Sequence, residues 1–219
     1  MAGHSLGEYS ALVAAGALEF PTALRLVRRR GELMAAAHDG GMAAIIGLDE
    51  QPLEQICSDV SAQGTPVVVA NYNSPGQLVI SGVISALEQA GTRAKEQGAK
   101  RVLPLKVSAA FHSPLMRGAS EGLAAAVAQA AIVDARVPVI SNVTAEPLVT
   151  VDAIRRELFE QVTSPVRWIA SVRYMTAAGV DTFVEVGPGN VLTGLIKRIV
   201  PDAQLINVKD LASAQAFDS

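Results

Sequence analysis

The chain has 219 residues, a net charge of −3 and a pI of about 5.6, and no basic block that would suit nucleic acid. Half of its residues are hydrophobic, enough for a core in one medium domain or two small ones. Its single cysteine, Cys57, excludes an internal disulfide and suits a reducing compartment. No apolar run of about 18 residues and no signal-peptide pattern occurs, so a cytoplasmic protein without a membrane span is expected.

The first element is a turn followed by a helix over residues 8–15. Gly3 to Gly7 read G-x-S-x-G, the pattern of a nucleophile elbow, in which a serine sits on a strained turn before a helix. Glycines would flank Ser5 because a Cβ would clash in so tight a turn. The N–H of Leu6, at the helix N-terminus, would then stabilise an oxyanion. So short a pattern also arises by chance in a glycine-rich chain.

A second helix is predicted over residues 21–37, with Pro21 in its first turn. Its apolar stripe consists of Ala23, Leu26, Val27, Leu33 and Met34. Arg30 falls inside this stripe, whereas Arg25, Arg28 and Arg29 face the other way and are expected in solvent. A guanidinium on an apolar face needs an anionic partner, because burying it unpaired is costly. From the pattern alone, a functional role with such a partner and a purely structural role, as a salt bridge or a snorkelling side chain, explain Arg30 equally well.

The elements expected in residues 41–106 have the order of a small subdomain that closes on itself. Strands are expected at 42–47, 66–72, 77–81 and 101–106, and helices at 51–63 and 83–97. This βαββαβ order is that of a ferredoxin-like fold. We therefore interpret 41–106 as an insertion between the two parts of a core domain, residues 1–40 and 107–219.

The second part of the core continues the alternation of helices and strands. Helices are expected at 113–131, 151–162, 166–178 and 191–199, and strands at 137–142, 182–186 and 204–208, before a frayed tail. Strands that alternate with helices predict an α/β fold with a mostly parallel sheet.

A serine nucleophile needs a base, and the chain has three histidines. His4 adjoins Ser5 in sequence, so its side chain is expected to point away and support the turn. His38 lies in a glycine-rich loop that is expected to be exposed. His112 follows an apolar strand, near the strand ends where α/β sites gather. Elimination favours His112, although a histidine that merely caps a loop is the commoner case.

Several motifs extend the elbow into a longer signature. GHSLGEYSAL closely resembles the nucleophile motif of the malonyl-CoA:acyl-carrier-protein transacylases, which acyltransferase domains of polyketide synthases share. The other matching segments are Arg30-Gly31, 73–77 (NSPGQ), 111–116 (FHSPLM), 164–168 (SPVRW) and 185–189 (EVGPG). The resemblance covers almost the entire chain and implies a hydrolase-like parallel-sheet core with an inserted ferredoxin-like subdomain.

The resemblance also implies roles for individual residues. Ser5 matches the acylated nucleophile, and His112 matches the general base and acid. Gln161 matches the position whose main-chain carbonyl orients that histidine. Leu6 matches a main-chain oxyanion donor, and Arg30 matches the residue that binds the malonyl carboxylate bidentately.

Two further positions match the substrate side of the family's site. Asn73 matches a position near the substrate mouth, although turn formation by Asn-Ser-Pro-Gly explains it equally well. Phe111, before His112, resembles malonyl-selective members. The implied partners are malonyl-CoA and acyl carrier protein, with no metal or redox cofactor and a monomer when complete.

The resemblance also reveals a departure from the family pattern. The family carries a G-Q-G-S-Q motif, whose last residue supplies a second oxyanion donor, on an N-terminal region that this sequence lacks. We therefore expect an N-terminal truncation, or a misassigned start, and little activity in the chain as given, because losing such a donor costs about 10²–10³ in kcat. The alternatives are an inactive relic or carrier-protein-binding module and, less favoured, a serine esterase, which would need a late histidine.

Overall fold

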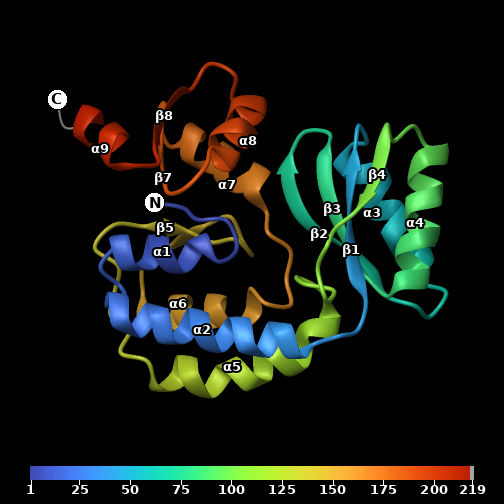
Figure 1. Ribbon diagram of the computed structural model, residues 1–219, viewed down its shortest axis with the longest axis horizontal. Coiled ribbons are helices and arrows are strands. Elements are labelled where there is room, and N and C mark those ends of the chain that lie inside the picture. Colours follow the sequence, from blue (N-terminus) through green and yellow to red (C-terminus); the bar gives the residue numbers. More distant parts are fainter. Residues whose placement is uncertain (218–219) are drawn as a thin grey trace.

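The computed structural model describes residues 1–217. A four-stranded antiparallel sheet and two helices form one side of the molecule (Figure 1). The strands run in the order β2-β3-β1-β4, with Gly41 opposite Gly82 in the central pair. The elements of this unit are β1 (Gly41–Ile46), α3 (Glu50–Ser61), β2 (Val67–Ser74), β3 (Gln77–Gly82), α4 (Ile84–Glu96) and β4 (Arg101–Pro104).

The two helices cover one face of this sheet because both have an apolar stripe at helical spacing. Leu53, Ile56 and Val60 of α3 are buried against the sheet, together with Leu87 and Ala90 of α4. The other face carries a smaller apolar cluster, made by Met42, Ala70 and Val79, and Phe111 packs against it. All six elements predicted for residues 42–106 are therefore present and in the predicted order.

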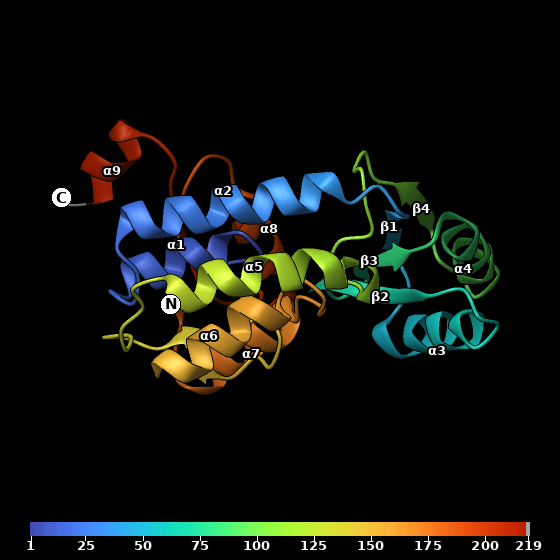
Figure 2. The same cartoon turned by 90° about the horizontal axis from the view of Figure 1, so that it is seen from below.

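A helical layer lies beside the sheet unit and contains the elbow helix. Its elements are α1 (Gly7–Ala14), α2 (Phe20–Ala36), the 3₁₀ turn η1 (Pro114–Met116), α5 (Arg117–Gln129) and α6 (Val151–Glu160). In Figure 2, α1, α2 and α5 run alongside one another, with α6 next to α5. Leu12, Leu26, Leu123, Ile154 and Leu158 are fully or almost fully buried between them. The helix predicted over residues 113–131 thus begins as a 3₁₀ turn.

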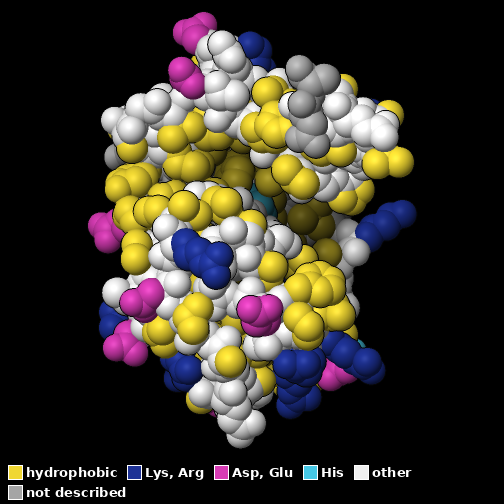
Figure 3. Space-filling model, turned by 90° about the vertical axis from the view of Figure 1, so that its left-hand side faces the viewer, with side chains coloured by type: hydrophobic (Ala, Val, Ile, Leu, Met, Phe, Trp, Pro, Cys, Tyr) yellow, Lys and Arg dark blue, Asp and Glu magenta, His cyan; other side chains and the backbone are white. Residues whose placement is uncertain are grey.

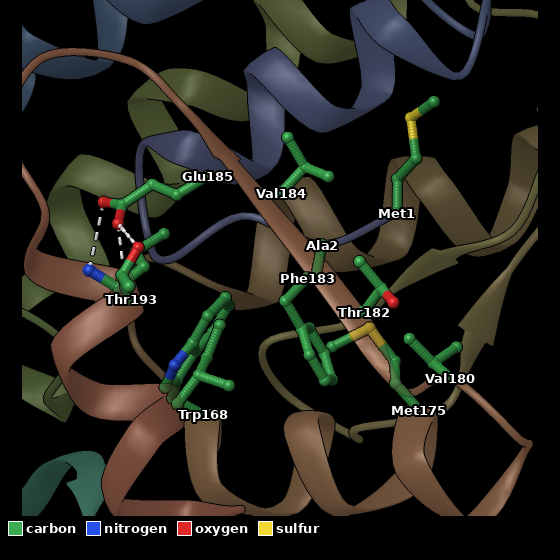
Figure 4. Close-up of a pocket in the computed structure, with 12 residues that line it drawn as sticks. Met1, Ala2, Trp168, Met175, Val180, Thr182, Phe183, Val184, Glu185 and Thr193 are labelled. Atoms are coloured by element: carbon green, nitrogen blue, oxygen red, sulfur yellow. Dashed lines mark hydrogen bonds between the residues drawn. The ribbon is translucent and has the colours of Figure 1, made fainter. Parts of the chain in front are cut away.

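The C-terminal third adds a parallel strand pair and three helices. Its elements are α7 (Trp168–Ala177), β7 (Thr182–Val186), α8 (Val191–Ile199), β8 (Gln204–Val208) and α9 (Leu211–Phe217). The helix α9 corrects the prediction of a frayed tail over the described residues. The Glu185 carboxylate accepts hydrogen bonds from the Leu192 and Thr193 N–H groups at 3.0 and 2.7 Å, and so ties β7 to the start of α8 (Figure 4).

The mostly parallel sheet expected for the core is present only in pieces among residues 1–217. Strand β7 pairs in parallel with β8, and Ala2 forms a parallel bridge with Ile140. The predicted strand over residues 137–142 shortens to β5 (Val139–Ile140), whose strand partner is β6 (Pro147–Leu148), in antiparallel pairing. The expected parallel pairing is therefore present in β7–β8 and in the Ala2 bridge, but these pieces do not join into one sheet among residues 1–217.

A cavity of about 230 Å³ separates two of these pieces. Met1 and Ala2 line one side, and β7 lines the other. The side chains of Phe183, Met175 and Trp168 gather along it (Figure 4). Hydrophobic side chains also surround the hollow that the space-filling view shows on this side of the molecule (Figure 3).

No helix of residues 1–217 has the length and apolar character that crossing a membrane requires.

Candidate active site

Ser5 lies on a strained turn between the Ala2 bridge and helix α1. Its φ is 50°, a left-handed conformation that a non-glycine residue rarely adopts. Asn142 stabilises the turn, since its Oδ1 accepts a hydrogen bond from the Ser5 N–H at 2.7 Å. The strained turn before a helix that the sequence predicts is therefore present. Such strain is typical of a residue that is kept in place for function.

The two flanking glycines have different roles. A Cβ on Gly3 would lie 2.0 Å from the main-chain oxygen of Gly7, so only glycine fits there. A Cβ on Gly7 would meet nothing within 4 Å. The prediction that both glycines avoid a clash is correct for Gly3 and wrong for Gly7, since it is the backbone of Gly7 that approaches Gly3.

His112 and Ser5 are in direct contact, although 107 positions separate them. Ser5 Oγ lies 2.7 Å from His112 Nε2. The main-chain oxygens of Gln161 and Ser164 lie 2.9 and 3.1 Å from His112 Nδ1. Carbonyl oxygens only accept, so Nδ1 carries the proton and Nε2 offers its lone pair to the serine hydroxyl. This tautomer is the one that a general base for Ser5 requires.

The pKa of His112 is lowered to about 4, chiefly by burial and also by the charge of Arg30. The two carbonyl contacts act in the opposite direction and stabilise the protonated ring. The imidazole is therefore neutral near pH 7 and can accept a proton from Ser5 Oγ. No carboxylate of the described residues contacts its Nδ1.

Arg30 reaches the same serine from helix α2. It is 5% exposed, which rules out snorkelling, and no acidic side chain of the described residues forms an ion pair with it. Its Nη2 donates to Ser5 Oγ at 3.0 Å and to Gln161 Oε1 at 3.2 Å, whereas its Nε has no partner among residues 1–217. A buried guanidinium with an unpaired donor, next to the Ser5 hydroxyl, is suited to bind an anionic group.

The other predicted residues lie around this centre. The N–H of Leu6 precedes α1 and has no acceptor among the described residues, so it is free to meet an oxyanion. Asn73 lies in β2, where its Oδ1 accepts from His4 Nε2 at 2.8 Å. Phe111 is partly buried beside His112. His38 is exposed and takes no part.

Two buried residues of the site were missed by the sequence analysis. Asn142 contacts both Gly3 and Ser5, and Glu8 contacts both Asn142 and Gln161. Glu8 stands inside the elbow motif but looks like an ordinary acid in the first turn of a helix. Asn142 ends a predicted strand, and that position was the one local signal for it.

The geometry is that of the class of proteins that form an ester on a serine: a serine hydroxyl in contact with a neutral histidine and with a buried arginine. The sequence profile of the acyl transferase domain matches residues 1–215. The chain is 50% identical over 212 residues to the malonyl CoA-acyl carrier protein transacylase of Bacillus subtilis, covering 95% of this chain and 67% of that protein. The Escherichia coli K12 protein of the same name is 50% identical over 203 residues, covering 91% and 65%.

Solved structures agree with these relatives. The malonyl CoA-acyl carrier protein transacylase of Coxiella burnetii superposes with a TM-score of 0.95 at 42% identity, covering 99% of this chain and 69% of that one. A malonyl-transacylase in complex with a type II polyketide acyl carrier protein superposes at 0.94 with 46% identity, covering 99% and 71%. The chain belongs to the acyl transferase family, among the malonyl CoA-acyl carrier protein transacylases. It spans about two thirds of the length of these relatives.

The contrast between the glycines can be tested through the free energy of unfolding. Gly3→Ala should destabilise the protein by about 1–3 kcal/mol or more, because the new methyl group meets backbone that cannot move aside. Gly7→Ala should be neutral or stabilising by up to about 1 kcal/mol, because Gly7 is the first residue of α1 and has space around it. Urea unfolding of both variants measures the difference, and equal losses would contradict it.

The low pKa of His112 predicts an unusual pH profile. The rate at which phenylmethanesulfonyl fluoride, an uncharged reagent, modifies Ser5 should stay constant from about pH 8 to about pH 5.5, since the base remains neutral. Arg30→Gln should raise the midpoint, because the arginine charge opposes protonation of the ring, but should leave it below the usual value of about 6.5, because burial, the larger cause, remains. Arg30→Lys retains the charge and is the control. A wild-type midpoint near 6.5 would contradict this account.

Proposed function

We propose that this protein transfers a malonyl group from malonyl-CoA to the phosphopantetheine thiol of an acyl carrier protein, in fatty acid or polyketide synthesis. One observation carries the proposal: His112 Nε2 and Arg30 Nη2 both lie within 3.0 Å of Ser5 Oγ. The first contact supports a serine ester as intermediate, and the second supports a substrate with a carboxylate. The names of the relatives point to the same reaction.

In the first half-reaction, Ser5 Oγ attacks the thioester carbonyl and gives its proton to His112 Nε2. The carbonyl oxygen becomes negatively charged, and the free N–H of Leu6 donates to it. When the tetrahedral intermediate collapses, the bond to sulfur breaks, CoA leaves as a thiol with the proton from His112, and the malonyl group remains on Ser5.

The second half-reaction reverses these roles. The thiol of the carrier protein's phosphopantetheine gives its proton to His112 and attacks the ester carbonyl. The ester bond breaks, Ser5 Oγ recovers the proton from His112, and the malonyl thioester departs. The same tautomer of His112 serves both steps, because Gln161 and Ser164 hold the Nδ1 proton throughout.

Arg30 supplies the specificity in this proposal. It cannot satisfy its donors within residues 1–217, so a malonyl carboxylate would remove the penalty of a buried guanidinium. An acetyl group would leave that penalty in place. Phe111 and Asn73 would complete the acyl and substrate side of the site.

We infer that residues 1–40 and 107–219 belong to a hydrolase-like core, and that residues 41–106 are a ferredoxin-like insertion. The order β2-β3-β1-β4 with antiparallel neighbours supports the second assignment. The site would then lie where the two units meet, since Asn73 comes from the sheet unit and Ser5 from the helical layer. A cytoplasmic monomer is the corresponding expectation for the protein.

A serine esterase of the α/β-hydrolase type is less well supported. Such an enzyme orients its histidine with a carboxylate and places that histidine late in the chain. Here carbonyl oxygens contact His112 Nδ1, and His112 is the last histidine of the sequence.

The nucleophile can be tested by mass spectrometry. Incubation with malonyl-CoA should add one malonyl group to Ser5, because this is the serine that donates to a neutral, oriented imidazole. Ser5→Ala should abolish the adduct, and Ser10→Ala, a change in the exposed face of α1, should leave it intact. Undiminished labelling of Ser5→Ala would refute the assignment.

The specificity residue can be tested with two acyl donors. Arg30→Ala should lose malonyl transfer by about 2–5 kcal/mol in kcat/KM, the usual penalty when a buried charge pair loses one partner. Acetyl transfer should be unchanged or faster, because an acetyl group has no carboxylate to pair. Competition between malonyl-CoA and acetyl-CoA measures the ratio. An equal fall in both activities would make Arg30 a structural residue.

A further inference from the structure

Glu8 has no part in the reaction described above, yet its side chain is fully buried beneath the site. It lies in the first turn of α1, is 0% exposed, and bonds with Asn142 and Gln161, which contact the site, and with a second buried acid, Glu157. A carboxyl group buried this deeply is costly unless its oxygens are bonded. Its bonding partners therefore indicate what it does.

One oxygen of Glu8 fixes the elbow through Asn142. Glu8 Oε1 accepts from the main-chain N–H of Asn142 at 2.8 Å and from its Nδ2 at 2.9 Å. That Nδ2 also donates to Gly3 O at 2.7 Å, and the amide oxygen is thereby turned toward the Ser5 N–H. The orientation of this amide supports the left-handed φ of Ser5.

The other oxygen of Glu8 fixes the side chain of Gln161. Gln161 Nε2 donates to Glu8 Oε2 and, at 3.0 Å, to the main-chain oxygen of Ser5. Both of these partners are acceptors, so the NH₂ group must face them and Oε1 must face Arg30, which donates to it at 3.2 Å. The main-chain oxygen of the same residue holds His112.

Glu157 is a useful neighbour for comparison. It is also buried and is hydrogen-bonded to Glu8, but its other partners are Ser141 Oγ and the main-chain N–H groups of Asn142 and Val143. Two carboxyl groups that bond to each other share one proton. Glu157 thus belongs to the same buried network, yet it contacts neither Gln161 nor the reacting residues.

We propose that Glu8 is a positioning residue, which orients the side-chain amide of Gln161 and thereby holds Ser5, His112 and Arg30 in their reacting geometry. The proposal rests on Ser5 as the nucleophile of the proposed function. It differs from a general stabilising role in one respect: the effect of Glu8 must pass through the side chain of Gln161.

The substitution Glu8→Gln keeps the acceptor that faces Asn142 and replaces the acceptor that faces Gln161 with a donor. The new amide oxygen can still accept from Asn142, but its NH₂ group faces the NH₂ group of Gln161, and two donors cannot bond. Gln161 must then turn or withdraw, which leaves Arg30 and Ser5 without this support. Glu157→Gln is the matched control, since its amide can donate to Glu8 and leaves the bond between Glu8 and Gln161 intact.

The readout is the rate at which a fluorophosphonate labels Ser5, followed by mass spectrometry. Glu8→Gln should slow labelling about 10- to 100-fold, the range expected from a misplacement of about 1 Å. Glu157→Gln should stay within about threefold of the wild type. Gln161→Ala should be as slow as Glu8→Gln, and the double variant Glu8→Gln/Gln161→Ala should be no slower than Gln161→Ala alone.

Several outcomes would overturn the proposal. These are wild-type labelling in Glu8→Gln or in Gln161→Ala, and a double variant whose loss is the product of the two single losses. Failure of Glu8→Gln to fold, when Glu157→Gln folds, would make Glu8 a structural residue. A wild-type protein that labels at Ser5 but does not transfer malonyl would refute the proposed function and leave this inference standing.

Discussion

Two main-chain carbonyl oxygens hold the Nδ1 proton of His112 and so leave Nε2 free to accept from Ser5 Oγ, the contact on which the proposed reaction depends. A carboxylate in their place would stabilise the imidazolium by a full charge, whereas carbonyl dipoles orient the ring and offset burial only in part. The base is therefore neutral in the free protein, with a pKa of about 4. Because Arg30 contributes to this low value, an anion bound to Arg30 would favour proton transfer from Ser5 to His112 when substrate is present.

The same centre concentrates backbone strain. Ser5 and His112 both have positive φ, at 50° and 57°, and each is held by hydrogen bonds from residues far away in sequence. Non-glycine residues keep such conformations only where surrounding bonds impose them, at a cost of about 1–3 kcal/mol each. Gln161 supplies bonds to both residues, from its main-chain oxygen to His112 and from its side chain to the Ser5 carbonyl. Gln161 thus stabilises both the turn at Ser5 and the orientation of the His112 ring.

The sequence predicted local elements far better than it predicted their partners. The bounds of β7, α8 and β8 agree with the prediction, because β-branched runs and a helical apolar stripe determine them locally. The parallel pairing is present in β7 and β8, but the way the strands group into separate sheets was not predicted, because alternating strands and helices specify right-handed crossovers but not which edges meet. Ala2 and β7 do not pair with each other but lie on opposite sides of a cavity, an arrangement that neither segment indicates by itself.

For the site, motif, elimination and resemblance singled out Ser5, His112 and Arg30, and the structure brings these three side chains into contact. Glu8 was not singled out. An acid in the first turn of a helix is favourable for its interaction with the helix dipole, so its local pattern is the same whether it is exposed or buried. Its function depends on Asn142 and Gln161, which are 134 and 153 positions away. Only the fold turns this ordinary acid into a buried acceptor, and the bonds that it accepts determine how the amides beside Ser5 must point.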